Sequence, residues 1–168
     1  MFEKFYPDLM LDGVWDIDLD SLKKKGIKGL ILDIDNTLVP QYRKEADENA
    51  VKWIERVKKA GFKICIVSNA SKKRVLKFND SVRVLAVHRA SKPGTGAFRK
   101  AALLMGIKLC ESAVVGDQIF TDIYGGNRAG AFTILVKPID KREFIFVRLK
   151  RIPERLVLRI YRKGTGGS

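Results

Sequence analysis

Cysteine is scarce in this chain of 168 residues, where only Cys65 and Cys110 occur. Two cysteines without a spacing pattern do not make a disulfide framework, and they fit a reducing compartment. Cys65 lies within the apolar run of residues 62–67, so we expect it to be a buried strand residue. A chain of this length with 46% apolar residues can instead be stabilised by one sizeable hydrophobic core.

Long apolar runs are also missing from the sequence. No stretch approaches the roughly 20 consecutive apolar residues that a membrane-spanning helix needs. The first ten residues lack a basic start followed by an apolar core, so they do not resemble a secretory signal. Repeats, low-complexity tracts and Pro-rich linkers are absent as well. We therefore expect a single domain over residues 1–163, located in the cytoplasm or at the inner face of the membrane. Residues 164–168 are interpreted as a flexible tail or a cloning remnant.

Positive charge, in contrast, is present in excess. The chain has 33 Lys and Arg against 19 Asp and Glu, a net charge of +14. Such a balance favours a polyanionic partner, which can be nucleic acid, an anionic membrane or a phosphorylated substrate. Ten basic and three acidic residues lie between position 137 and the end of the chain, so the excess is concentrated there.

The basic C-terminal segment, residues 141–163, shows two stripes at helical spacing. The apolar stripe is Ile145, Leu149, Ile152, Leu156 and Ile160, and the basic stripe is Arg148, Arg151, Arg155, Arg159 and Arg162. Pro153 predicts two short helices, with the proline at the start of the second. Two interpretations remain open: a helix packed on the sheet with a solvated arginine face, or a basic amphipathic surface for anionic lipid.

The rest of the chain alternates between strand and helix patterns. Short, nearly continuous apolar runs predict buried strands at residues 27–32, 62–67, 82–87, 113–115 and 132–136. Helices are expected between them, with Asp47 or Asn49 and Thr95 as N-caps, a shorter helix over 71–78, and another over 117–129. This order predicts an α/β fold: a three-layer, Rossmann-like sandwich with a mostly parallel sheet of about five strands.

Polar residues follow these strands, and the carboxyl ends of parallel strands meet in one crevice. There, carboxylates at Asp33 and Asp117 are hard oxygen ligands suited to Mg²⁺. The hydroxyls of Thr37 and Ser68, together with Lys92, can hold phosphate oxygens. Asn69 is a further candidate phosphate contact, although it can instead cap the following helix.

This inventory suits a phosphatase. Asp33 can attack phosphorus to form an aspartyl-phosphate, and Asp35 can protonate the leaving oxygen and then activate water. The bare Asp-x-Asp pattern is weak, since Asp16-Ile17-Asp18 repeats it without a preceding buried strand. We interpret that second copy as a loop and helix cap.

Four motifs in order resemble those of the haloacid dehalogenase (HAD) superfamily. They are Asp33-Ile34-Asp35-Asn36-Thr37-Leu38, Ser68, Lys92, and Gly116-Asp117 with Asp122. The resemblance implies Asp33 as nucleophile, Asp35 as acid/base, and Ser68 and Lys92 as phosphate ligands. It also implies Mg²⁺ bound by Asp33, Asp117 and the backbone carbonyl of Asp35, with Asp122 in the surroundings of the metal.

A narrower resemblance involves Phe5-Tyr6-Pro7-Asp8, Gly26-Ile27-Lys28 and Gly116-Asp117-Gln118-Ile119-Phe120-Thr121-Asp122 with Gly125-Gly126-Asn127-Arg128. These segments are similar to YqeG-type HAD proteins, which resemble the mitochondrial phosphatidylglycerophosphate phosphatases. The resemblance implies a lipid phosphate monoester as substrate. Only 32 residues separate Asp35 from Ser68, and 23 separate Ser68 from Lys92, so we expect no cap domain.

Two alternatives stay open at this point. One is a phosphatase for a soluble metabolite or a nucleic-acid end, with nucleic acid the less favoured partner. The other is a binding protein that uses the HAD scaffold without depending on catalysis. The acidic residues and the lysine at the expected positions argue against the second alternative.

Overall fold

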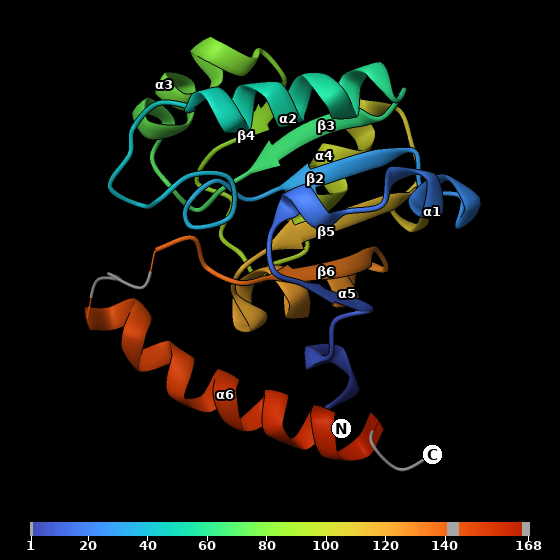
Figure 1. The fold of residues 1–168 in the computed structure, drawn as a ribbon, viewed down its shortest axis with the longest axis vertical. Coiled ribbons are helices and arrows are strands. Elements are labelled where there is room, and N and C mark those ends of the chain that lie inside the picture. The colour runs from blue at the N-terminus through green and yellow to red at the C-terminus, as the bar shows by residue number, and fades with distance from the viewer. Residues whose placement is uncertain (1, 141–144, 166–168) are drawn as a thin grey trace.

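The computed structural model of the chain describes residues 2–140 and 145–165, and its centre is a six-stranded sheet (Figure 1). The strand order is β1-β6-β5-β2-β3-β4, and every neighbouring pair is parallel. The strands are β1 (Leu9–Leu11), β2 (Gly29–Leu32), β3 (Lys63–Val67), β4 (Leu85–Val87), β5 (Ser112–Gly116) and β6 (Phe132–Val136). The two strands that carry most of the predicted site, β2 and β5, are therefore adjacent in the middle of the sheet.

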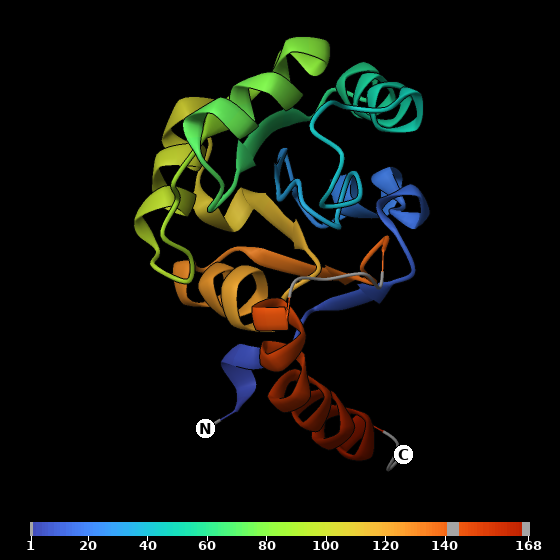
Figure 2. The same cartoon turned by 90° about the vertical axis from the view of Figure 1, so that its left-hand side faces the viewer.

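Helices cover both faces of the sheet (Figure 2). Helices α1 (Leu19–Lys24), α2 (Glu48–Lys59) and α3 (Lys72–Val82) pack on one face, where Leu30 and Leu32 of β2 join their apolar side chains in one core. Helix α4 (Gly96–Met105) packs on the other face with Ile31, Cys65 and neighbouring residues, and α5 (Tyr124–Ala129) adjoins it. The alternation along β2 explains why its sequence is continuously apolar, because both of its faces are buried. The predicted three-layer α/β fold is confirmed.

Short helical turns complete the described chain. Three are 3₁₀ turns, η1 (Glu3–Phe5), η2 (Val14–Asp16) and η3 (Leu109–Glu111), and η4 (Ile119–Ile123) is a π-helical turn. The helix expected over residues 117–129 is therefore two elements, η4 followed by α5.

The sheet differs from the prediction at its two edges. Strand β1 was not predicted, because its apolar run of Leu9, Met10 and Leu11 is only three residues long and each of them is only half-buried. At the opposite edge, the strand expected over residues 82–87 begins only at Leu85, because α3 continues through Val82. Val82 is buried as the last residue of that helix, so its apolar side chain reflects helix packing and not a strand.

The capping predictions are confirmed in part. The side chains of Asp47 and Asp18 accept hydrogen bonds from the backbone N–H groups of Ala50 and Ser21, so the second Asp-x-Asp copy is indeed a helix cap. Ser71, and not Asn69, caps α3. Thr95 makes no side-chain cap, because its backbone is already helical, whereas a cap residue is normally extended.

The two cysteines lie in different environments. Cys65 is fully buried in β3, as predicted, and burial raises the pKa of its thiol to about 12. Cys110 is exposed on η3, which precedes β5.

Helix α6 (Ile145–Thr165) lies outside the sandwich, alongside the N-terminal segment (Figures 1 and 2). It is one helix with Pro153 inside it, so the prediction of two short helices is wrong, and it extends to Thr165, two residues into the predicted tail. An internal proline removes one helical hydrogen bond, at a cost of about 3 kcal/mol or more. The packing of Glu154 and Val157, which are both buried, helps to offset this cost.

The face of α6 that packs on the protein is not the predicted apolar stripe. Ile152, Leu156 and Ile160 are 66%, 59% and 44% exposed, whereas Glu154 and Val157 are buried. The interpretation in which the apolar stripe packs on the sheet is therefore wrong for these residues. The side chains of Ile145, Leu149 and Arg148 lie outside the described part of the chain. None of the described helices is long and apolar enough to cross a bilayer.

Candidate active site

The loop after β2 brings Asp33 and Asp35 to the carboxyl end of the sheet. Ile34 and Leu38 are fully buried in the core and anchor the loop, which leaves the two aspartates facing the site. Asn36 directly follows Asp35 and has a positive φ of 60°. It donates its backbone N–H to the carbonyl of Val39, which closes the turn. Asparagine tolerates this left-handed conformation better than most residues, so the tight turn is encoded locally.

Lys92 lies at the centre of the site and is buried. Its Nζ atom donates to Oδ1 of Asp33 at 2.8 Å and to Oδ1 of Asp122 at 2.6 Å. Burial alone would lower the pKa of Lys92, but the charges of Asp122 and Asp33 outweigh burial and raise it. The lysine therefore remains a cation next to the predicted nucleophile.

The predicted phosphate contacts after β3 have mainly structural partners. Asn69 accepts from the backbone N–H of Lys92 at 2.8 Å and donates to its carbonyl at 3.3 Å, which fixes the loop that carries the lysine. The hydroxyl of Ser68 is buried and accepts from the N–H of Ala70 at 3.1 Å. Ser68 follows β3 directly and so lies at the same end of the sheet as Asp33.

Three buried carboxylates form a cluster suited to a cation. Asp33, Asp117 and Asp122 each offer an oxygen, and these oxygens lie within 4.8 Å of one another. Burial and the charge of Asp33 raise the pKa of Asp117 well above its ordinary value, and burial raises the pKa of Asp122 to about 6. A set of hard oxygen ligands under mutual repulsion fits a divalent ion such as Mg²⁺. Asp122, which the resemblance places only in the surroundings of the metal, thus belongs to the cluster.

Two other residues shape this cluster. The hydroxyl of Thr37 donates to Oδ1 of Asp117 at 3.2 Å, so Thr37 orients a predicted metal ligand. Gly116 has to lack a side chain, because a Cβ atom there would lie 2.2 Å from the carboxylate of Asp122. The Gly116-Asp117 pair is therefore required by close packing as well as by chemistry.

Arg74 is a site residue that the sequence did not reveal. Its Nη2 atom donates to Oδ1 of Asp35 at 3.0 Å, and its Nη1 atom donates to the carbonyl of Lys44 at 2.7 Å. Burial and the charge of Asp33 raise the pKa of Asp35, while Arg74 opposes them. Arg74 is one of many basic residues in the chain. Only the packing of the first turn of α3 beside the loop of Asp35 sets it apart, and the sequence does not show this packing.

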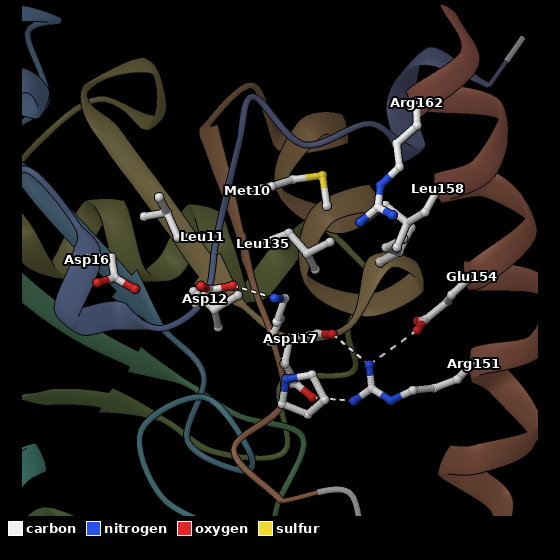
Figure 3. A pocket seen from close by; sticks show the side chains of 14 residues that line it. Met10, Leu11, Asp12, Asp16, Asp117, Leu135, Arg151, Glu154, Leu158 and Arg162 are labelled. Atoms are coloured by element: carbon white, nitrogen blue, oxygen red, sulfur yellow. Dashed lines mark hydrogen bonds and ion pairs between the residues drawn. The ribbon is translucent and has the colours of Figure 1, made fainter. Parts of the chain in front are cut away.

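Arg151 reaches the site from α6 (Figure 3). Its Nη2 atom donates to Oδ2 of Asp117 at 2.5 Å, and its Nη1 atom donates to the backbone carbonyl of Asp117 at 2.9 Å. We predicted Arg151 as part of an outward basic stripe, and this prediction is wrong, because the side chain points into the protein. A sequence pattern cannot distinguish one arginine of a regular stripe from the next.

A cavity of about 500 Å³ lies between α6 and the edge formed by β1 and β6, directly beside Asp117 (Figure 3). Its wall combines apolar and charged side chains: Met10, Leu11, Asp12, Asp16, Asp117, Ile119, Leu135, Val136, Lys137, Pro138, Arg151, Glu154, Leu158 and Arg162. The residues between Asp35 and Lys92 form loops, α2, β3, α3 and β4, with no inserted cap domain in this described segment. The site is therefore bordered by α6 and not by a lid between the motifs.

Comparison with known proteins gives a consistent result. The family model described as mitochondrial PGP phosphatase matches residues 2–139. A Bacillus subtilis protein named "Probable phosphatase YqeG" is 38% identical over 166 residues, which cover 98% of this chain and 96% of that protein. Phosphatidylglycerophosphate phosphatase 1 of Arabidopsis thaliana, chloroplastic and mitochondrial by its name, is 36% identical over 161 residues. That match covers 88% of this chain, which spans about half (46%) of the Arabidopsis protein.

Solved structures agree on the fold. A HAD phosphatase from Thermococcus onnurineus superposes with a TM-score of 0.58 at 14% identity, covering 71% of this chain and 90% of that structure. The cobalt-bound deoxy-D-mannose-octulosonate 8-phosphate phosphatase of Haemophilus influenzae gives 0.52 at 15% identity, with coverages of 69% and 81%.

Proposed function

We propose a covalent mechanism for this chain, which belongs to the mitochondrial PGP phosphatase family and is a phosphatase with a HAD fold. In this mechanism the chain hydrolyses a phosphate monoester through an intermediate on Asp33. The observation that carries this proposal is the convergence of Asp33, Asp35, Lys92 and Asp117 at the ends of neighbouring strands. We further propose that the substrate is a lipid phosphate, phosphatidylglycerophosphate.

The proposed chemistry has two steps. A carboxylate oxygen of Asp33 bonds to phosphorus, the bond from phosphorus to the alcohol oxygen breaks, and Asp35 gives its proton to that oxygen. Asp35 then takes a proton from a water molecule that attacks phosphorus, which releases phosphate and regenerates Asp33. The raised pKa of Asp35 supports its part in the first step, because the carboxyl must carry a proton there.

We propose Mg²⁺ as the cation of this site. Asp33, Asp117 and the carbonyl of Asp35 are the proposed ligands, with Asp122 adjoining them. When bound, the ion offsets the repulsion between a carboxylate and the dianionic phosphoryl group. Lys92 supplies further positive charge, and we propose that it, Thr37, Ser68 and Asn69 border the phosphate.

The lipid part of the proposal rests on two supports. The relative from Arabidopsis is named for phosphatidylglycerophosphate, and the matching family model has the same substrate in its description. The cavity beside Asp117 also suits an amphiphile, since Met10, Leu135 and Leu158 line it together with Arg162. The wall also carries Asp12, Asp16 and Glu154 beside Lys137 and Arg162, so the cavity supports the lipid proposal through its apolar side chains and not through its charge.

A membrane surface is the proposed partner of the outer face of α6. Ile152, Leu156 and Ile160 are exposed there, and Arg155 and Arg159 lie among them on the surface. Glu154 is buried, so the exposed side chains between residues 152 and 162 include no carboxylate. An apolar stripe flanked by cations without anions is typical of helices that lie in the interface of an anionic bilayer.

Phosphate release from a substrate panel tests the proposed activity. The panel contains phosphatidylglycerophosphate in mixed micelles, soluble sugar phosphates, a 5′-phosphorylated oligonucleotide and a generic aryl phosphate, each with Mg²⁺ and with chelator. We expect Mg²⁺-dependent release with the highest kcat/KM for the lipid. Preference for a soluble or nucleic-acid phosphate would overturn the lipid assignment, and no release from any substrate would favour a binding protein.

Vesicle binding tests the membrane surface separately. Each arginine near an anionic bilayer contributes about 1 kcal/mol, so the double variant Arg155→Gln/Arg159→Gln should bind such vesicles about 30-fold more weakly. The variant Arg56→Gln/Lys59→Gln removes the same charge from the exposed side of α2 and should bind as the wild type does. Equal losses in both variants, or no binding by the wild type at low salt, would contradict a dedicated surface on α6.

A further inference from the structure

The contact between Arg151 and Asp117 joins the C-terminal helix to a proposed metal ligand. The guanidinium engages Asp117 at two points, the carboxylate oxygen Oδ2 and the backbone carbonyl. The side chain of Asp117 is fully buried, and that of Arg151 is 15% exposed. A contact so well shielded from water is screened little by salt.

Both carboxylate oxygens of Asp117 accept a hydrogen bond in this arrangement. Thr37 donates to Oδ1, and Arg151 donates to Oδ2. The other two carboxylates of the cluster, Asp33 and Asp122, share the ammonium group of Lys92. Each acid of the cluster therefore has a cationic side chain of the protein beside it, and Arg151 is the one that neutralises Asp117.

We propose that Arg151 competes with the divalent metal for Asp117, so that helix α6 sets the metal affinity of the site. This inference rests on the proposed function, because it takes Asp117 to be a metal ligand. A metal ion and a guanidinium bound to one carboxylate repel each other, so each should weaken the binding of the other to Asp117. The apparent affinity for metal is reduced by the fraction of molecules in which Arg151 occupies Asp117.

The surroundings of Arg151 give it a place to move without leaving the protein. Nη1 lies 3.5 Å from Oε2 of Glu154, one turn further along α6. Glu154 is itself buried and accepts from the backbone N–H of Phe120 at 3.4 Å. The cavity of about 500 Å³ opens beside both residues. Arg151 can therefore keep its bond to Glu154 while its second nitrogen releases Asp117.

Isothermal titration with MgCl₂, in the absence of substrate and lipid, tests the competition. Arg151→Gln should bind Mg²⁺ more tightly than the wild type, by about tenfold for a charge-assisted contact of ordinary strength. Arg151→Lys should fall between the two, because a compact ammonium lacks the two-point geometry. Arg155→Gln removes the same charge from the exposed face of the helix and should leave the affinity unchanged.

Weaker or unchanged Mg²⁺ binding by Arg151→Gln would overturn the proposal, since Arg151 would then support the ligand or not affect it. A second measurement uses the unmodified protein: hydrogen exchange in residues 151–162 should speed up on addition of Mg²⁺ if the contact is released. Slower or unchanged exchange in a metal-bound protein would also overturn it. Neither readout depends on turnover, so loss of the proposed phosphatase activity in the substrate panel is a distinguishable result.

Discussion

The carboxyl ends of β2 and β5 supply the carboxylates of the site, whereas α6 supplies a cation, Arg151, from outside the sandwich. Asp33 and Asp117 directly follow central strands whose apolar side chains are buried on both faces. Among the side chains of α6 that the structure describes, Glu154 and Val157 are buried, whereas Ile152, Leu156 and Ile160 face solvent. The acids are thus held by the buried centre of the sheet and one of their counterions by a peripheral helix. We expect substitutions at the strand ends to affect chemistry, and substitutions on α6 to affect affinity.

The largest effect is expected for the nucleophile. Asp33→Asn cannot form the acyl-phosphate, so kcat should fall by about 10⁴-fold or more. Asp18→Asn is the matched control from the second Asp-Ile-Asp copy, because asparagine also caps helices well and the activity should be retained. Substantial activity in Asp33→Asn, measured as phosphate release, would rule out covalent catalysis at the end of β2.

A smaller loss is expected at the acid/base residue. Asp35→Asn should lower kcat by about 10²- to 10⁴-fold, the usual contribution of a positioned proton donor and acceptor. Metal binding should persist, because the proposed contact at this residue is the backbone carbonyl. Titration with Mg²⁺ alongside the kinetics separates the two roles, and lost metal binding with normal turnover at saturating metal would contradict the assignment.

Packing at the end of β5 can be tested by stability. Gly116→Ala places a methyl group against the carboxylate of Asp122, and overpacking of this kind costs about 1–3 kcal/mol. Gly96→Ala is a suitable control, since no atom lies within 4 Å of the added Cβ at the start of α4. That variant should be stabilised by about 0.4–1 kcal/mol through the unfolded state. Urea unfolding of both proteins checks the comparison, and equal stability of the two would show that the strand end is not tightly packed.

The smallest effect concerns the pH profile. Arg74 opposes the upward shift in the pKa of Asp35, so Arg74→Met should raise that pKa further. The protonated carboxyl then persists to higher pH, and the alkaline limb of single-turnover phosphoryl transfer should move upward. Lys73→Met, on the exposed side of the same helix turn, should leave the limb in place. A downward shift in Arg74→Met would show that Arg74 acts mainly on another group.

The residues at the strand ends could be predicted from the sequence, because the pattern that identifies a strand end lies within a few neighbouring residues. A buried apolar run followed by polar residues identifies a parallel strand end, and four such ends must meet. Asp33, Asp35, Lys92 and Asp117 were all located in this way. Asp47 as a helix cap and Cys65 as a buried strand residue follow from similarly local patterns.

The two arginines of the site could not be predicted, because their contacts depend on how α3 and α6 pack against the rest of the protein. Arg74 and Arg151 belong to a chain with 33 basic residues, and nothing near them in sequence distinguishes them. The apolar stripe of α6 left two interpretations open, since a regular helical pattern does not specify whether the protein or another phase covers it. Strand β1 escaped detection for a different reason, because an apolar run of three residues is too short to identify a strand.

The contrast between the two cysteines makes the native sequence ready for site-specific spectroscopy. Cys65 is enclosed in the core, and burial raises the pKa of its thiol to about 12. The thiol therefore stays protonated near neutral pH, and maleimide reagents should spare it in the folded protein. Cys110 is exposed on η3, at the amino end of β5, while the aspartates lie at the carboxyl end of the same strand. A fluorophore attached there reports on the orientation of the protein at a bilayer without any engineered thiol and without touching the catalytic edge.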